Sequence, residues 1–142
     1  MLDDYVLQLC EHANVARSNQ EDDIVDAEVV LEQAFACSRV LAVYGTLAPG
    51  ERNHHLLAEC PGIWTRGAVH GRRAERDNPV FTYDPLTATV PVQVLTSAGL
   101  PRQWAQLDAF ESPSHRRILV PVFAGSRLIQ VANLYEAQHP VD

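Results

Sequence analysis

The fold is decided by Val40-Leu41-Ala42-Val43-Tyr44-Gly45-Thr46-Leu47-Ala48-Pro49-Gly50, a stretch in which an apolar run ends at two glycines and a proline. Its first four residues predict a short buried strand. A strand that stops at a glycine-containing turn leaves backbone N–H groups free to bind an anion or a carboxylate. Its local pattern alone fits an ordinary turn as well as a binding loop, and the rest of the chain must decide between them.

The composition is that of one globular domain. The chain has 142 residues, of which 46% are hydrophobic and 20% charged, which suits a single domain with a real core. The formal charge of −7, from 11 Lys+Arg and 18 Asp+Glu, argues against a nucleic-acid partner, because phosphates need clustered cations. No apolar run approaches the roughly 20 residues that span a bilayer, and the acidic start lacks a secretory signal. We therefore expect a soluble cytoplasmic protein without a membrane partner.

The three cysteines predict no disulfide framework. Cys10, Cys37 and Cys60 are odd in number, widely spaced and set in apolar surroundings. These features favour reduced thiols in the core.

The first 38 residues predict a helical hairpin. Apolar residues recur at helical spacing from residue 2 to about 17, and again from about 21 to 37. Ser18 with Glu21, or Asn19 with Asp22, would cap the second helix. Nothing in this segment suggests chemistry, so we interpret residues 1–38 as an extension for packing or for a homodimer contact. Residues 39–142 then form the main domain.

From residue 53 onward the pattern changes to a mixture dominated by strands. A short helical turn is expected at 53–59, a polar loop at 72–78 and a helix at 100–110 that begins with Pro101 and carries Leu100, Trp104, Leu107 and Phe110 on one face. Pro91 lies in a predicted strand and lacks a donor, which indicates an edge position or a bulge. Strands are predicted at 63–71, 80–83, 89–95, 118–123 and 128–135, the last two as a hairpin around Gly125. The fold class is therefore α+β, with a mostly antiparallel or mixed sheet that a small closed or half-closed barrel would complete.

Histidines raise the question of a metal. His54 and His55 are adjacent, so they point in different directions, and no third ligand sits at a tight spacing. His70 and His115 would complete a site only if folding brought them close. We interpret the pair as part of a polar turn and expect no metal. No Gly-x-Ser-x-Gly elbow, Cys-x-x-Cys pair or phosphate-binding glycine loop occurs in the sequence.

Two carboxylates near the end of the helix at 100–110 are the remaining candidates. We interpret Asp108 as a cap or a surface group. Glu111 follows Leu107 and Phe110 at the transition from helix to loop, where a carboxylate can be half-buried against apolar walls. Burial would raise its pKa and allow proton exchange near neutral pH.

Taken together, these segments resemble the gamma-glutamylcyclotransferase-like family, and within it the small bacterial members and the gamma-glutamylamine cyclotransferases. The family carries a Tyr-Gly-Thr/Ser-Leu loop after its first strand and an Arg-Asn-His segment soon after, which resemble Tyr44-Gly45-Thr46-Leu47 and Arg52-Asn53-His54 here. Its Leu-Asp-x-x-Glu segment resembles Leu107-Asp108-Ala109-Phe110-Glu111. The resemblance covers roughly residues 39–136 and leaves the helical hairpin outside it.

The resemblance implies a small mixed, mostly antiparallel β-barrel with flanking helices and an active cavity at its mouth. It also implies cofactor-free cyclisation of a small gamma-glutamyl compound to 5-oxoproline, with release of an amine or amino acid. In that interpretation Glu111 is the catalytic acid and base, and backbone groups of Tyr44, Gly45, Thr46 and Leu47 bind the gamma-glutamyl group. Tyr135 matches a recurrent aromatic position that either lines the pocket or packs in the core. The leaving group stays open.

Two positions depart from the family pattern. Ser112 stands where the family usually has a glycine after the glutamate, and His115 stands where it has a tyrosine. We interpret His115 as a surface residue and Arg117 as a member of a structural ion pair. These departures keep a second hypothesis open, namely a non-catalytic domain that binds or senses a small molecule on the same fold.

Overall fold

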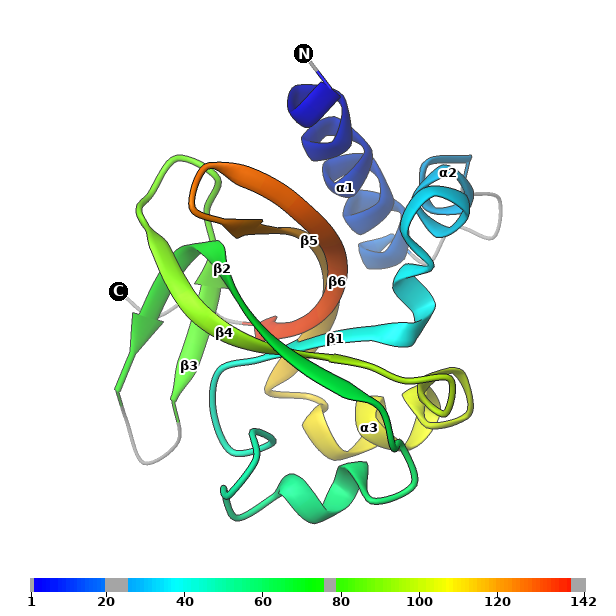
Figure 1. The fold of residues 1–142 in the computed structure, drawn as a ribbon, viewed down its shortest axis with the longest axis vertical. Coiled ribbons are helices and arrows are strands. Elements are labelled where there is room, and N and C mark those ends of the chain that lie inside the picture. The colour runs from blue at the N-terminus through cyan, green and yellow to red at the C-terminus, as the bar shows by residue number, and fades with distance from the viewer. Residues whose placement is uncertain (1, 20–25, 76–78, 139–142) are drawn as a thin grey trace.

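A computed structural model describes residues 2–19, 26–75 and 79–138 of the 142. Three α-helices, three short 3-10 helices and six strands follow one another along the chain (Figure 1). Their bounds are α1 Leu2–Ser18, α2 Asp26–Phe35, η1 Cys37–Arg39, β1 Val40–Val43, η2 His54–Leu57, β2 Ile63–Ala74, β3 Val80–Tyr83, β4 Thr89–Thr96, η3 Leu100–Arg102, α3 Trp104–Glu111, β5 His115–Ala124 and β6 Arg127–Ala137.

Five of the strands close into a barrel, and the sixth lies beside it. The strand order is β3-β2-β4-β1-β6-β5, and an additional pairing of Ala68 with Phe123 joins β2 to β5 and closes the ring (Figure 1). β1 and β6 run parallel, whereas the other pairs are antiparallel. The predicted fold class, a small mixed and mostly antiparallel barrel with flanking helices, is confirmed.

Every second residue of the barrel strands points inward, and these side chains fill the barrel. Inward-facing residues from all five barrel strands form one buried cluster, which Phe81 of β3 joins. All four residues of β1 are buried because this strand is covered on both faces. Its inward residues are Val40 and Ala42, while Leu41 and Val43 belong to a second cluster outside the barrel.

That second cluster packs α3 and the loop after β1 onto the outside of β1 and β4, with Trp104 and Leu107 supplied by the helix. A third cluster lies under the N-terminal hairpin, where Val6, Cys10 and Leu31 pack against Leu119 of β5 and Val131 of β6. Figure 1 shows α1 and α2 together on that side of the barrel. Helix α3 and the hairpin therefore cover different parts of the barrel wall.

The structure corrects three of the predicted elements. β2 continues through Arg72 to Ala74, where a loop was expected, because these residues pair with β3. The helix expected at 100–110 is split into η3 and α3. α2 ends at Phe35 because Ala36 adopts a left-handed conformation with φ of 51°, while residues 20–25, which include most of the expected cap, lie outside the described part. The prediction for Pro91 is confirmed, because β1 pairs with β4 only as far as Gln93 and Pro91 pairs only with Ala68 of β2, which is an edge position among the described strands.

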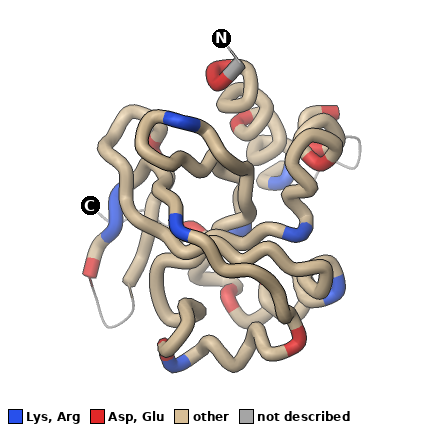
Figure 2. The backbone as a smooth tube through the Cα atoms, in the orientation of Figure 1, with Lys and Arg blue, Asp and Glu red and all other residues tan. Residues whose placement is uncertain are grey.

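Charged positions are spread along the chain rather than gathered on one element (Figure 2). All three cysteines are free and buried, as predicted. Within the described ranges, no helix is both long and apolar enough to cross a membrane. The hairpin exposes Tyr5, Val15, Val29 and Val30. The homodimer contact through these helices and the boundary at residue 38 stay predictions.

Candidate active site

The parallel pairing of β1 with β6 brings the loop after β1 to Tyr135, near the end of β6. The Tyr44 hydroxyl donates a hydrogen bond of 2.6 Å to the carbonyl oxygen of Tyr135. The Asn53 backbone N–H donates to the carbonyl of Thr46 at 2.9 Å, and its side-chain amide donates to the Thr46 hydroxyl at 2.9 Å. These bonds fix the conformation of the loop, which explains why the Arg-Asn-His segment accompanies the Tyr-Gly-Thr-Leu segment in the sequence.

Unused donors remain in this loop. The N–H groups of Gly45, Thr46 and Leu47 make no hydrogen bond to any acceptor in the described ranges, whereas the N–H of Ala48 donates to the carbonyl of Gly45 at 3.0 Å. Successive free N–H groups form a concave site that favours negative charge. Because the φ of Gly45 is not positive, the left-handed position of the loop is Gly50, with φ of 84°.

The loop and Glu111 both line a cavity of about 190 Å³. Every residue that the sequence predicted for the site lines this cavity, although they come from three separate segments of the chain. They are Tyr44, Gly45, Thr46, Leu47, Glu111 and Tyr135, joined by Asn53, Pro79, Phe110, Ser114 and His115 among others. The roles of these residues stay predictions, but the structure brings all of them together.

Glu111 is the last residue of α3, and its side chain is only 14% exposed. Burial raises the pKa of its carboxyl group from 4.5 to about 7. A carboxyl group with that pKa exchanges a proton readily at neutral pH, as a general acid and base must. The half-buried environment expected from the sequence is therefore confirmed. Phe110 is the exception on that helix, because it is 47% exposed at the cavity instead of packing with Leu107.

His115 is not the surface residue expected from the sequence. Its side chain is 14% exposed and lines the cavity, and Nδ1 lies 3.6 Å from Oε2 of Glu111, too far for a hydrogen bond. The Ser114 hydroxyl donates to the carbonyl of Glu111 at 3.1 Å, so it accepts from Nδ1 of His115, also at 3.1 Å. Burial lowers the pKa of His115. A neutral imidazole therefore lies beside a carboxyl group whose pKa is raised to about 7.

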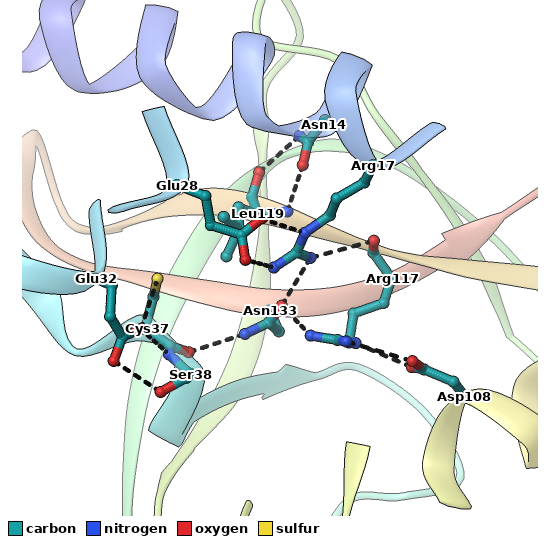
Figure 3. A network of polar contacts seen from close by, with 10 residues as sticks. All are labelled: Asn14, Arg17, Glu28, Glu32, Cys37, Ser38, Asp108, Arg117, Leu119 and Asn133. Carbon is teal, nitrogen blue, oxygen red and sulfur yellow. Dashed lines mark hydrogen bonds and ion pairs between the residues drawn. The ribbon is translucent and has the colours of Figure 1, made fainter. Parts of the chain in front are cut away.

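Asp108 has the exposure expected of a surface group, because its side chain is 43% exposed, but its carboxylate also bonds Arg117 and Tyr135. The Arg117 guanidinium binds both of its oxygens, at 2.9 and 3.3 Å, and the Tyr135 hydroxyl donates to Oδ1 at 2.6 Å (Figure 3 shows the arginine contacts). Burial, followed by the bond to Asp108, raises the pKa of the Tyr135 hydroxyl above its usual range. The contact of 2.9 Å with Asp108 confirms the ion pair predicted for Arg117, which also stacks on Trp104, 4.4 Å from the ring centre. Asp108 thus positions Tyr135 at the cavity.

A network behind this pair extends to the N-terminal hairpin and was missed from the sequence. Oδ1 of the buried Asn133 accepts from Arg117 and from Arg17 of α1, both at 2.9 Å (Figure 3). Arg17 in turn forms a bidentate pair with Glu28 of α2, at 2.7 and 3.0 Å. No local pattern predicts contacts between residues about a hundred positions apart. The one signal in the sequence was Asn133, an amide side chain in an otherwise apolar strand.

The four histidines considered for a metal, His54, His55, His70 and His115, are each engaged in a hydrogen bond. Nδ1 of His54 donates to the carbonyl of Leu47 at 2.9 Å, and Nδ1 of His70 donates to Thr87 at 2.7 Å. In the described ranges no three His, Cys, Asp or Glu side chains lie close enough to hold a metal ion. His54 therefore helps to shape the loop.

The departure at Ser112 carries no backbone cost. Its φ of −78° and ψ of 149° are extended values that any residue adopts, so a glycine is not required after Glu111.

A closed mixed barrel thus carries, at one cavity, a loop with unused backbone donors and a half-buried glutamate. The sequence matches the family described as gamma-glutamyl cyclotransferase, AIG2-like, over residues 41–141, and the chain belongs to that family. The resemblance noted in the sequence is confirmed. Comparison with curated proteins gives no match.

Solved structures share the fold. An uncharacterised protein from Pyrococcus horikoshii, PH0828, matches with a TM-score of 0.59 and 17% identity, over 72% of this chain and 80% of that one. YkqA from Bacillus subtilis matches with a TM-score of 0.58 and 26% identity, over 70% of this chain but 36% of its own length. An AIG2-like protein from Mus musculus matches with a TM-score of 0.50 and 20% identity, over 72% of this chain and 79% of that one.

Proposed function

We propose that this chain catalyses the intramolecular cyclisation of a gamma-glutamyl compound to 5-oxoproline, with release of an amine. The observation that supports the proposal is that the Glu111 carboxyl group and the unused N–H groups of Gly45, Thr46 and Leu47 line one cavity. At about 190 Å³ this cavity is smaller than the pockets of about 300–1,000 Å³ that take drug-sized ligands, so it suits a single glutamyl group.

The reaction needs little from the protein beyond these groups. The substrate's α-amine attacks its own γ-carbonyl carbon, so the nucleophile is tethered and five-membered ring closure is entropically favoured. Glu111 accepts a proton from the substrate's α-ammonium group, which frees the amine to attack, and returns one to the leaving nitrogen as the C–N bond breaks. The products are the lactam and a free amine, and the atoms balance without a co-reactant.

The loop supplies binding and charge stabilisation. Donors of Gly45, Thr46 and Leu47 hold the substrate carboxylate or the oxyanion that develops on the γ-carbonyl oxygen. Tyr44 and Tyr135 hold the two sides of the cavity together through their 2.6 Å hydrogen bond, and Tyr135 forms an aromatic wall.

The test is to incubate the protein with gamma-glutamyl-alanine and gamma-glutamyl-methylamide and to measure 5-oxoproline. Wild-type protein should form it, and Glu111→Gln should reduce the rate by about 10²–10⁴-fold, the usual contribution of a general acid and base. Glu59→Gln is the matched control, because Glu59 is exposed and does not line the cavity. Full activity in Glu111→Gln would disprove the assigned role.

The alternative hypothesis, a non-catalytic binding domain, draws on one observation. His115 occupies the wall position where the family has a tyrosine, so the surroundings of Glu111 differ from the family pattern. Binding of gamma-glutamyl-alanine by calorimetry, without 5-oxoproline at any pH from 6 to 9, would favour this alternative.

A further inference from the structure

The loop side of the candidate active site offers hydrogen-bond donors to a ligand. The N–H groups of Gly45, Thr46 and Leu47 suit the carboxylate or the oxyanion of a gamma-glutamyl compound, but its α-ammonium group carries only donors of its own. The carbonyl oxygens of the same three residues already accept hydrogen bonds, from two backbone N–H groups and from Nδ1 of His54. The ammonium group therefore needs acceptors from another part of the cavity.

The imidazole ring of His115 offers such an acceptor. This ring lines the cavity together with Glu111, and its Nδ1 donates to the Ser114 hydroxyl at 3.1 Å. A neutral imidazole has one N–H, so Nε2 carries the free lone pair. Nε2 has no partner among the described residues, and it is not closed off from solvent. The Tyr83 hydroxyl is the one fully buried side-chain N or O atom in that part of the chain that lacks a partner.

The distance between His115 and Glu111 places this acceptor near the reacting amine. Nδ1 of His115 lies 3.6 Å from Oε2 of Glu111, so the imidazole ring and the carboxyl group are neighbours. In the proposed reaction the α-ammonium group lies within hydrogen-bond reach of Glu111, because it gives this residue a proton. An ammonium group at that place has three N–H donors, which is enough to bond both side chains.

The proton of the ammonium group passes to Glu111 and not to His115. Burial raises the pKa of Glu111 to about 7 and lowers the pKa of His115. Glu111 is therefore the stronger base of the two, and His115 stays neutral at pH 7, as a hydrogen-bond acceptor must. Among the described residues that line this cavity, Glu111 is the one acid and none is a lysine or an arginine, so no described cation there repels the ammonium group.

We infer that His115 is a further substrate-binding residue, whose Nε2 accepts a hydrogen bond from the α-amino group of the substrate. The inference rests on the proposed function and adds how the nucleophile is held. Once Glu111 has taken one proton, the bond to Nε2 fixes one of the two remaining N–H groups, so the nitrogen lone pair is directed at the γ-carbonyl carbon. His115 itself neither gains nor loses a proton. Ser114 is the positioning residue, because its hydroxyl fixes the tautomer of His115.

The first test measures binding by calorimetry in a Glu111→Gln background, where turnover is slow. The ligands are gamma-glutamyl-methylamide and its deamino analogue, glutaric acid monomethylamide, which differ only in the α-amino group. Adding His115→Phe should raise the dissociation constant of the first ligand by about tenfold or more, as expected for a lost hydrogen bond to a charged group, and that of the analogue by less than about twofold. His115→Gln, which restores a neutral acceptor, should recover part of the loss. His55→Phe is the matched control, because His55 is exposed and does not line the cavity.

The second test measures turnover of gamma-glutamyl-methylamide with Glu111 in place. His115→Phe should lower kcat/KM by about tenfold or more, and His115→Gln should recover part of the rate. Ser114→Ala should lower kcat/KM by less, since it only releases the tautomer. Heteronuclear NMR of the imidazole nitrogens should show Nε2 of His115 as the unprotonated one. In Glu111→Gln its resonance should move when gamma-glutamyl-methylamide is added, but not when the deamino analogue is added.

The outcomes separate the inference from the proposed function. Equal changes in affinity for the two ligands in His115→Phe would overturn the inference, while 5-oxoproline formation by wild-type protein upheld the function. A preference for the ligand with the amino group that persists in His115→Phe and disappears in Asn53→Ala would place the ammonium group at the loop and would also overturn the inference. Absence of 5-oxoproline with wild-type protein would reject the proposed function, whereas the binding ratio needs no turnover and still decides whether His115 holds the α-amino group. Far-UV circular dichroism and the urea midpoint confirm that each variant is folded.

Discussion

Replacing Glu111 with Gln should make the protein more stable at high pH, although the change removes the proposed catalytic group. Burial raises the pKa of this carboxyl group from 4.5 to about 7. Between those values the folded protein holds a proton that the unfolded chain has lost, so stability falls as the pH rises and the loss is complete above about pH 7. At about 1.4 kcal/mol for each pH unit, the rise in pKa corresponds to about 3 kcal/mol. Glutamine stays neutral and does not incur this cost.

The assay is urea denaturation of wild type and Glu111→Gln at pH 4.5 and pH 8. The gain in unfolding free energy on substitution should be larger at pH 8, by up to about 3 kcal/mol, because all other ionisable groups are common to both proteins. Glu59→Gln, at an exposed position, should show no such difference. Equal gains at the two pH values would mean that the carboxyl group is not destabilised by burial, and the basis for its acid and base role would fail. The pH profile of kcat/KM should also rise through about pH 7 in wild type, because the base must be ionised to accept a proton.

Three further substitutions probe the surroundings of the site. Asn133→Leu removes the acceptor of two arginines and the donor to Cys37, so the unfolding free energy should fall by about 3 kcal/mol, and an unchanged urea midpoint would contradict the network. Gly71→Ala places a Cβ against the Phe81 ring and the Thr82 carbonyl oxygen and should cost about 1–3 kcal/mol, whereas a thermal midpoint equal to wild type would show that both the ring and the backbone give way. Tyr135→Phe removes the 2.6 Å bond to Asp108 and should cost about 1.5–3 kcal/mol together with a drop in kcat/KM; stability and turnover both at wild-type level would show that the bond has no role.

Prediction from the sequence succeeded best for segments whose residue chemistry and local pattern indicate the same structure. The strand at 40–43, the glycine loop and the glutamate at the end of a helix all rest on neighbouring residues, and the structure places them around one cavity. Helical spacing assigned Phe110 to the buried face of the helix. α3 is short, however, and Phe110 in its last turn is exposed at the cavity instead of packing on the barrel. Helical periodicity identifies a face but not the point at which the helix leaves the core.

Long-range polar contacts were not predicted from the sequence, for a different reason. Arg17 and Asn133 are 116 positions apart, and Asn14 and Leu119 are 105 apart, so no spacing rule connects them. Burial of Glu136 was also missed, because its partners Arg116 and the Tyr83 N–H come from two other strands. The same holds for the end of β2, where Arg72 and Arg73 have the polar character of a loop but pair with β3 in the structure.

The attachment of the hairpin to β5 and β6 has a consequence for how the chain folds. α1 is synthesised before β5 and β6, the strands that hold it through Asn14 and Arg17. Contacts of such large sequence separation slow folding, because the intervening loop must close before they form. A nascent chain therefore carries an unanchored amphipathic helix until β6 has formed. Pulse-labelled hydrogen exchange during refolding should accordingly show the amides of α1 becoming protected together with those of β5 and β6, and not earlier.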